Sequence, residues 1–337
     1  MKRRIAGHIF QNGEMARGTL VISDDGYEIV PGILNDSICG TIIPSLVNAH
    51  THLGDSFITK VPAGSISETV GPGGFKEKAL SGATSQEITR GMSWAQEVML
   101  STGTTCFVDF RESGMKGVKL LRNTEQKNLR QVILGRPSGD DRAGEVLSVS
   151  EGIALSSLND LPLSFILETK NAVKKQGKIF AMHFSENVRE SIENLAQVAP
   201  DFIVHGIETS ESELEQLAEM KIPVVITPHS NVFYGKRPDY SRFARKGIAT
   251  MLGTDNGMIT SPNLLAEMSF LYHYQRQIDS LEPSYILNMA TEVPRQFFRS
   301  LGIGIPDSFV LFPNVLLTER EIVTRGTYYN RKIIQIA

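Results

Sequence analysis

Over residues 80–300, short apolar runs alternate with stretches that have the hydrophobic period of a helix, and this order most constrains the fold. Eight runs are expected to be strands, the residue ranges 41–47, 104–110, 131–134, 152–155, 179–182, 202–204, 222–226 and 248–252. Parallel strands separated by helices form an open doubly wound sheet or a closed barrel, and eight strands favour the barrel. The absence of a Gly-x-Gly-x-x-Gly motif after any strand weakens the dinucleotide-binding alternative. We therefore predict an α/β fold, a (β/α)8 TIM-type barrel.

Several helix boundaries are marked by capping signals. Residues 84–87 and 210–213 each fit a capping box, with a hydroxyl residue first and a glutamate three positions later. Ser261, followed by Pro262, is expected to cap the helix after the eighth strand. An apolar face over residues 188–198 predicts a helix after the fifth strand.

The two ends of the chain have a different pattern, in which short β-like runs alternate with turn residues. Neither residues 1–40 nor residues 307–337 could bury a core alone. We expect the two segments together to form one small composite β-sandwich beside a barrel of residues 41–306.

Charge and cysteine content restrict the class of protein. The formal net charge of −3 argues against a nucleic-acid partner, which would require a basic face. The two cysteines form neither a disulfide framework nor a CxxC motif, and no apolar run approaches a membrane span. We expect a cytoplasmic protein with a small-molecule substrate and no membrane partner. Whether the chain forms a homo-oligomer is left open.

Polar residues that can bind a metal fall at the carboxyl ends of the expected strands, where barrel enzymes place their catalytic residues. These residues are His50, His52, His183, His205 and Asp255. A single histidine at a strand end is usually only a satisfied polar residue, but five such positions in one pattern are hard to obtain by chance. Imidazoles with a carboxylate suit zinc or another divalent ion and leave one position for water.

Five segments give the chain a resemblance to the amidohydrolase superfamily, in its cytosine deaminase and triazine hydrolase (ATZ/TRZ, chlorohydrolase-like) branch. They are Ile43-Pro44-Ser45-Leu46-Val47-Asn48-Ala49-His50-Thr51-His52-Leu53, Met182-His183-Phe184-Ser185-Glu186, Val204-His205-Gly206, Thr227-Pro228-His229-Ser230-Asn231 and Leu252-Gly253-Thr254-Asp255-Asn256. They match that branch in order and rough spacing, and the resemblance spans nearly the whole chain.

The resemblance implies a role for each of these side chains. One metal would be held by His50, His52, His183 and Asp255. Glu186 would carry protons between the attacking water and the leaving group, and His205 would orient the water or polarise the substrate. Asp255 would be a ligand, a base or both. For Glu186, a favourable carboxylate at a helix N-terminus is the alternative.

The number of metals can be narrowed, because binuclear relatives commonly bridge their ions with a modified lysine at the end of the fourth strand. Residues 145–169 contain no lysine. The sequence therefore favours one divalent ion, with zinc preferred and iron or manganese as alternatives.

Candidates for substrate contact lie at the same rim. Arg111 follows the second strand and Arg136 the third, where arginine could clamp a carboxylate or phosphate. An ion pair between rim loops is the alternative for each. His229 and Asn231 follow the seventh strand and are candidates too, with a loop hydrogen bond as the alternative for His229.

The segment from Gly54 to Gly82 is long for a barrel loop. A glycine-rich stretch, residues 71–74, could act as the hinge of a lid over the site. Lys76 and Lys78 could then approach an anionic substrate, although solvated charge is the favoured interpretation. The tryptophan-containing segment of nucleoside-type deaminases has no match here, which puts adenosine-like substrates in doubt.

The leading hypothesis is a metal-dependent amidohydrolase that deaminates an amino-substituted N-heterocycle with a metal-activated water. The same residues could instead cleave a C–Cl, C–S or cyclic amide bond. A non-catalytic binding protein on an amidohydrolase scaffold is the third hypothesis, and the full set of site residues argues against it.

Overall fold

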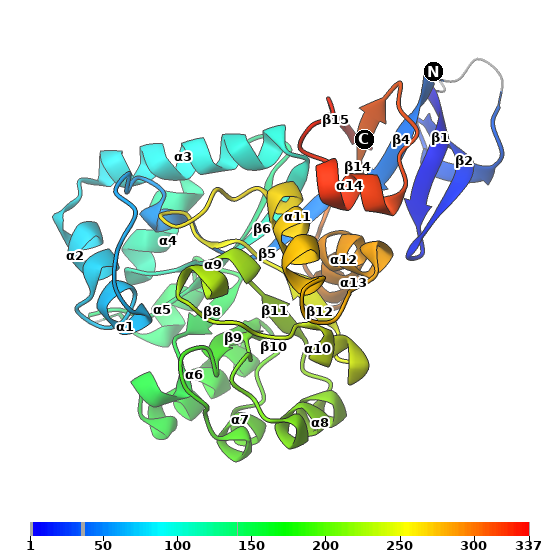
Figure 1. Cartoon of the computed structure of the whole chain (residues 1–337). Helices are drawn as coiled ribbons and strands as arrows, with labels where there is room; N and C mark the ends of the chain where they lie inside the picture. The colour runs from blue at the N-terminus through cyan, green and yellow to red at the C-terminus, as the bar shows by residue number, and fades with distance from the viewer. Residues whose placement is uncertain (1–2, 35–37, 140, 337) are drawn as a thin grey trace.

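The computed structural model describes residues 3–34, 38–139 and 141–336. The larger part is a parallel sheet surrounded by helices (Figure 1). From edge to edge its strands are β12 (Thr250–Leu252), β11 (Val224–Ile226), β10 (Phe202–His205), β9 (Ile179–Phe184), β8 (Gly152–Leu155), β7 (Arg130–Gly135), β6 (Thr104–Arg111), β5 (Leu46–His52) and β13 (Asp255–Asn256). Each pair of neighbouring strands is parallel.

Helices alternate with these strands along the chain, as the sequence predicts. They are α1 (Ile66–Thr69), α2 (Phe75–Gly82), α3 (Ser85–Ser101), α4 (Gly114–Arg122), α5 (Ala143–Leu147), α6 (Leu163–Lys175), α7 (Ile192–Val198), α8 (Glu211–Met220), α9 (Pro228–Phe233), α10 (Ser241–Arg245), α11 (Leu264–Gln275), α12 (Pro283–Ala290) and α13 (Glu292–Ser300), with short 3-10 turns at Leu53–Asp55 and Leu158–Asp160. Among the described residues, none of the helices combines the length and apolar character that crossing a bilayer requires.

Both faces of the parallel sheet are buried, which explains why its strands read as nearly continuous apolar runs. On β6, Cys106, Val108 and Phe110 belong to one apolar cluster and Phe107 to another. The first cluster includes Phe298 of α13. Alternate side chains of one strand therefore anchor two separate cores.

The sheet curls strongly, because its two edges come from neighbouring residues. Strand β12 pairs with β11 at one edge, and β13 pairs with β5 at the other. Between them, the Gly253 amide donates to Ile226 and the Thr254 amide donates to His50. The carboxyl ends of β5 and β9 are thereby turned toward a common centre.

The two ends of the chain form a second, six-stranded sheet beside the larger one (Figure 1). Its order is β15 (Lys332–Gln335), β14 (Ser308–Pro313), β4 (Ile38–Pro44), β1 (Arg3–Gln11), β2 (Glu14–Ser23) and β3 (Gly26–Pro31), and α14 (Glu319–Arg325) lies between β14 and β15 in the chain. The expected sandwich is thus composite, but its described residues form one hydrogen-bonded sheet instead of two. Residues 1–2, 35–37 and 337 of this region lie outside the described part of the chain.

The expected first strand, residues 41–47, is two strands. Strand β4 belongs to the small sheet and pairs with β14, whereas β5 belongs to the large one. The Ser45 amide, at the junction, donates to the Ser308 carbonyl. Apolar character continues through the junction, so hydrophobicity alone does not reveal the break. The expected boundary between residues 40 and 41 falls inside β4.

Two expected helix starts were also wrong. The Asn263 side chain caps α11 by accepting from the amides of Leu265 and Ala266, whereas Ser261 was expected to cap it. Helix α7 begins after Ser191, and Val188 is exposed instead of lying on its buried face. The capping boxes at Thr84 and Ser210 are confirmed.

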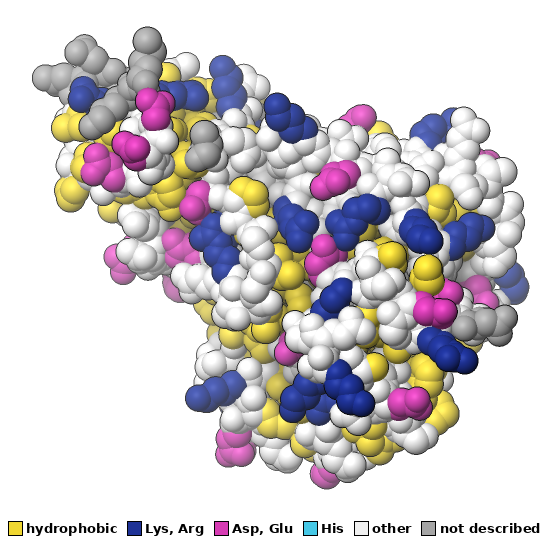
Figure 2. Space-filling view, turned by 180° about the vertical axis from the view of Figure 1, so that it is seen from behind, with side chains coloured by type: hydrophobic (Ala, Val, Ile, Leu, Met, Phe, Trp, Pro, Cys, Tyr) yellow, Lys and Arg dark blue, Asp and Glu magenta, His cyan; other side chains and the backbone are white. Residues whose placement is uncertain are grey.

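The face opposite to that of Figure 1 carries basic and acidic side chains mingled over the larger part of the molecule (Figure 2). Several Lys and Arg side chains lie in a row across the middle of this face, with Asp and Glu side chains above and below them.

Candidate metal centre and active-site cavity

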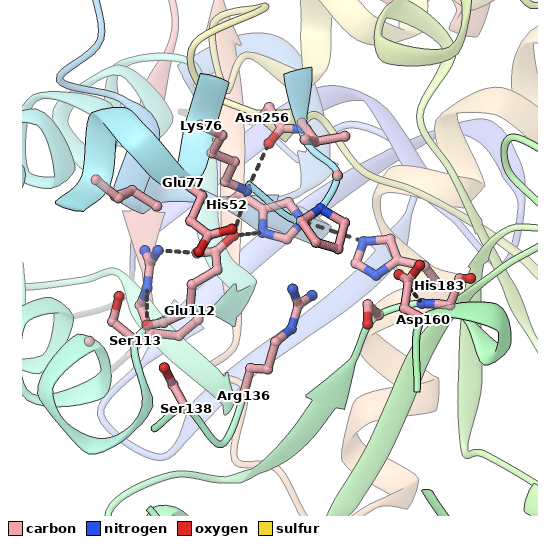
Figure 3. Close-up of a pocket in the computed structure, with 18 of the residues that line it drawn as sticks. His52, Lys76, Glu77, Glu112, Ser113, Arg136, Ser138, Asp160, His183 and Asn256 are labelled. Carbon is pink, nitrogen blue, oxygen red and sulfur yellow. Dashed lines mark hydrogen bonds and ion pairs between the residues drawn. The ribbon is translucent and has the colours of Figure 1, made fainter. Parts of the chain in front are cut away.

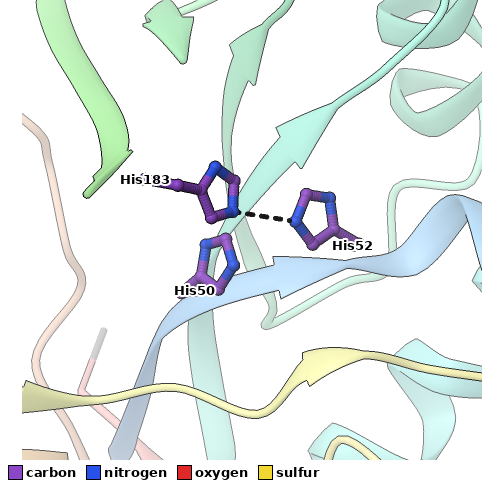
Figure 4. A group of neighbouring side chains, drawn as sticks. All are labelled: His50, His52 and His183. Atoms are coloured by element: carbon purple, nitrogen blue, oxygen red, sulfur yellow. Dashed lines mark hydrogen bonds between the residues drawn. The ribbon is translucent and has the colours of Figure 1, made fainter. Parts of the chain in front are cut away.

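Three histidines meet at the carboxyl ends of two strands (Figure 4). His50 and His52 lie two residues apart on β5, so both side chains leave the strand on the same side. His183 comes from β9, and its Nε2 atom lies 3.3 Å from Nε2 of His52. One ring nitrogen of each histidine lies within 4.8 Å of the other two. The structure therefore brings together all three histidines that were expected to bind metal.

The hydrogen bonds of these rings define their protonation. Nδ1 of His52 lies 3.0 Å from the Phe110 carbonyl, and Nδ1 of His183 lies 3.2 Å from the Leu155 carbonyl. A carbonyl oxygen can only accept, so each Nδ1 atom carries a proton. Burial lowers the pKa of His52 to about 4 and holds that of His183 well below its usual range, so both rings are neutral. Two proton-free Nε2 atoms thus face each other.

This arrangement fits a bound cation. Two nitrogen lone pairs that face each other repel, and neither ring can donate a proton to the other. Ligand atoms around a tetrahedral zinc ion with bonds of 2.0–2.1 Å lie roughly 3.3 Å apart. The separation between Nε2 of His52 and Nε2 of His183 is 3.3 Å. Nδ1 of His50 is a further buried polar atom with no hydrogen-bond partner among the described residues.

Asp255 completes the group from β13. Its Oδ1 atom lies 3.2 Å from Nε2 of His50 and 3.6 Å from Nε2 of His52. The other oxygen, Oδ2, accepts a hydrogen bond of 2.5 Å from the Ser230 hydroxyl. Asp255 has a φ of 62°, a conformation that is uncommon outside glycine and often found at functional sites. The strained backbone turns the carboxylate toward the histidines.

Glu186 and His205 form a second pair beside the expected metal ligands. Oε2 of Glu186 lies 3.5 Å from Nε2 of His205, and ligand atoms of both residues lie within 4.8 Å of one in Asp255. Burial, followed by the charge of Asp255, raises the pKa of Glu186 to about 8. A carboxyl group tuned in this way can both accept and donate a proton near neutral pH.

Asn231 orients His205 from behind. Its Nδ2 atom donates to Nδ1 of His205 over 3.1 Å, and Tyr240 donates to its Oδ1 atom. Because Nδ1 of His205 accepts, the ring proton lies on Nε2, which faces Glu186. Asn231 is fully buried and does not line the cavity. The structure thus places Asn231 behind His205, and its expected contact with substrate stays a prediction.

His229 also lies away from the cavity lining. Its Nδ1 atom lies 2.6 Å from Oε2 of Glu267, and its ring stacks on Phe270 with centroids 3.9 Å apart. These contacts hold α9 against α11. The alternative for His229, a loop hydrogen-bonding role, matches these contacts, and the expected substrate contact stays a prediction.

A buried group of charged side chains contacts Nδ1 of His52, on the side of the ring away from His183 (Figure 3). Oε1 of Glu112 lies 2.7 Å from Nδ1 of His52, and Glu112 also pairs with Lys76 and Arg111. Burial alone would raise the pKa of Glu112, but Lys76 and Arg111 hold it well below its usual range. A carboxylate on the outer nitrogen of a ligand histidine fixes the ring and increases its basicity.

Lys76 reaches this group from the long segment after β5. Its Nζ atom donates to Oδ1 of Asn256 over 2.9 Å and lies 3.7 Å from Oδ2 of Asp55. Lys76 is buried, so the interpretation as solvated charge was wrong for it, whereas Lys78 is exposed. Sequence patterns carry no signal for this contact, because Lys76 and Asn256 are distant along the chain.

A cavity of about 650 Å³ opens over these residues. Its lining includes His52, His183, Glu186, His205 and Asp255, together with Arg111 and Arg136. Arg111 is 1% exposed and pairs with Asp109 and Glu112, so its charge is used within the protein. The expected site residues, apart from His229 and Asn231, therefore gather at the base and wall of one cavity, with His50 buried beneath it.

Residues 41–304 match the amidohydrolase family. An uncharacterised protein of Methanocaldococcus jannaschii is 30% identical in sequence, in an alignment that covers 92% of this chain and 90% of that one. The chain therefore belongs to the amidohydrolase family, and it is an enzyme.

Solved structures share its fold at low sequence identity. Atrazine chlorohydrolase of Arthrobacter aurescens, complexed with zinc, superposes with a TM-score of 0.79 at 14% identity, covering 95% of this chain and 90% of that one. An adenosine deaminase of Xanthomonas campestris with bound zinc superposes with a TM-score of 0.76 at 15% identity, covering 95% and 88%. This likeness concerns the fold.

Proposed function

We propose that this enzyme hydrolytically deaminates an amino-substituted N-heterocycle and holds one divalent ion, preferably zinc, through His50, His52, His183 and Asp255. The observation that carries the proposal is the 3.3 Å separation between Nε2 of His52 and Nε2 of His183, next to the Glu186–His205 pair. The pairing of residues 250–256 with both β11 and β5 supports the closed eight-stranded barrel on which such a centre would be built.

Each residue has a distinct part in this reaction. The ion, when bound, supplies hydroxide at neutral pH by lowering the pKa of water from 15.7 to about 7. Glu186 accepts the proton that the attacking water loses and delivers it to the leaving amine. The Nε2 proton of His205 can donate to a ring nitrogen or oxygen that gains electron density during attack. Asn231 keeps His205 in the tautomer that this step requires.

Two similar folds differ in the bond that their names describe, a C–Cl bond in atrazine chlorohydrolase and an amine in adenosine deaminase. The same constellation could serve either reaction, since both replace a leaving group on an aromatic carbon by water. Glu186 favours deamination, because a leaving amine needs a proton and a leaving chloride does not.

Ammonia release tests the proposal. Zinc-loaded protein is assayed with a panel of pterins, purines, pyrimidines and triazines, and at least one amino-substituted member is expected to release stoichiometric ammonia. No ammonia from any of them, together with chloride or ring-opened product from another substrate class, would replace deamination by that reaction. Less than about 0.2 metal per chain after expression with added zinc, iron or manganese would favour an inert binding protein.

Glu186→Gln separates proton transfer from metal binding. The variant is expected to retain its metal and to lose about 10²–10⁴-fold in kcat, the usual contribution of a general acid–base residue. Elemental analysis and steady-state kinetics measure the two effects. Glu168→Gln, at an exposed position on α6, is the matched control and should change neither. Loss of metal from the Glu186 variant would show that Glu186 is a ligand.

A further inference from the structure

Arg136 is a cation in the cavity that forms no ion pair with the carboxylates of the described residues. It follows β7 and lines the cavity, and its guanidinium extends between Glu112 and His183 (Figure 3). Its Nε atom is buried without a hydrogen-bond partner among the described residues. Glu112 and Asp160, which line the same cavity, act on its charge from a distance, but none of the described carboxylates lies within 4.0 Å of its guanidinium nitrogens.

The charge of the neighbouring Arg111, in the same cavity, is compensated by protein carboxylates. Arg111 pairs with Asp109 at 3.4 Å and with Glu112, and both of these carboxylates are held by the protein. Glu112 is in turn shared with Lys76 and His52. Glu112 is therefore already engaged by other groups.

An arginine that forms no ion pair within the protein indicates a site for an anion. A guanidinium group cannot lose its proton in a protein, so it stays charged even where burial disfavours the charge. Removing such a charge from water is unfavourable unless a partner compensates it. The planar fork of nitrogen donors matches two oxygens of a carboxylate or phosphate in bidentate geometry.

The surroundings of Arg136 can accommodate such a group. The hydroxyls of Ser113 and Ser138 lie on the same side of the cavity (Figure 3) and form no side-chain hydrogen bond with the described residues. Lys116, which is exposed, also lines this side. The cavity volume of about 650 Å³ exceeds what a single aromatic ring fills, so space remains beside a ring placed at the metal ligands.

We propose that the substrate carries an anionic oxygen group, a carboxylate or a phosphate, which Arg136 binds while the reacting amino group lies at the metal centre. The identity of the reacting end rests on the proposed function, whereas the anionic end rests on Arg136. Arg136 is then the residue that selects charged over uncharged heterocycles.

Pairs of charged and uncharged ligands test this selection, and binding affinity is measured in a variant that does not turn them over. Zinc-loaded protein carrying Glu186→Gln is titrated calorimetrically with pterin and pterin-6-carboxylate, with cytidine and cytidine 5′-monophosphate, and with guanosine and guanosine 5′-monophosphate. At least one charged member is expected to bind about 10- to 100-fold more tightly than its uncharged twin, the range of a charge-assisted bidentate contact. The pterin pair reports a carboxylate site, and the nucleotide pairs report a phosphate site.

Arg136→Gln, added to the same protein, should reduce this preference to less than about threefold and leave binding of the uncharged twin unchanged. Arg136→Lys, which keeps the charge but not the planar fork, should retain part of the preference. Arg142→Gln is the matched control, because Arg142 is exposed and lies outside the cavity lining. Equal binding of every pair, or a preference that survives Arg136→Gln, overturns the inference.

Failure of this inference and failure of the proposed function are distinguishable. If the charged probes bind through Arg136 but no amino-heterocycle releases ammonia from the zinc-loaded wild-type protein, deamination is wrong and the anion site stands. If ammonia is released from uncharged heterocycles as fast as from charged ones, deamination stands and the anion site is wrong.

Discussion

At the scale of single residues, the proposed metal centre depends on side chains outside the expected set of ligands. Glu112 holds the outer nitrogen of His52, and the Phe110 carbonyl shares the same proton. Asn231 defines the tautomer of His205 by donating to its Nδ1 atom. In both cases a neighbouring group determines which ring nitrogen carries the proton and which one is free to accept or to bind. The presence of a histidine in the sequence does not determine its tautomer.

Glu112→Gln tests this support. The amide keeps the shape of the side chain but loses the charge that increases the basicity of His52, so zinc affinity should fall about 10- to 100-fold. Competition with a chelator measures the affinity. Glu125→Gln, at an exposed position, is the matched control and should leave the affinity unchanged. Unchanged affinity in the Glu112 variant would mean that Phe110 alone orients the ring.

At the scale of elements, the start of α11 determines how α9 is held. Asn263 accepts from two amides at the start of α11, and Glu267, one turn later, accepts from the amide of His229 on α9. The first turn of α11 therefore carries both a cap and the contact that holds α9. A shift of this helix start would move the residues that stand behind His205.

Asn263→Ala removes the cap and should lower the free energy of unfolding by about 1 kcal/mol, within the usual range of 0.5–2 kcal/mol for this change. Chemical denaturation measures the loss. The matched variant is Ser261→Ala, since Ser261 was the cap expected from sequence and is exposed. A larger effect at Ser261 than at Asn263 would show that the helix starts two residues earlier in solution.

At the scale of the whole molecule, the two cysteines report on different parts of the structure. Cys106 lies on β6 inside the curled sheet, and burial raises the pKa of its thiol to about 12, whereas Cys39 is exposed. Because the thiolate is the reactive form, native protein should show one thiol that reacts with a disulfide reagent at pH 8. Unfolded protein should show two. Rapid reaction of both in native protein would mean that the large sheet opens easily.

Metal binding should stabilise the entire fold, since the ligands meet only when β5, β9 and β13 are in place. Zinc at about 100 times its dissociation constant should add about 2.7 kcal/mol to the free energy of unfolding, and a chelator should remove this gain. Thermal unfolding with and without zinc measures it. His183→Asn should abolish the zinc-dependent gain, and His273→Asn, at an exposed position on α11, should preserve it.

Much of this protein was predictable from local sequence. The alternation of apolar runs and helical patterns predicted the parallel α/β sheet, because burial on both faces imposes apolar runs on strands. His50, His52, His183, Glu186, His205 and Asp255 were predictable as one group, because parallel strands end at the same rim. The capping boxes at Thr84 and Ser210 were predictable because their donors and acceptors lie within one turn.

Other features were decided only by the tertiary structure. Lys76, Glu112 and Asn256 lie on separate elements and meet in one buried group, while Nε of Arg136 has no hydrogen-bond partner among the described residues. Asn231 turned out to orient His205, although its position after a strand suggested substrate contact. The division between β4 and β5 depends on which sheet each strand joins. Sequence reports the period and the chemistry of side chains, whereas pairing between distant charges depends on loop paths and side-chain directions that no local pattern encodes.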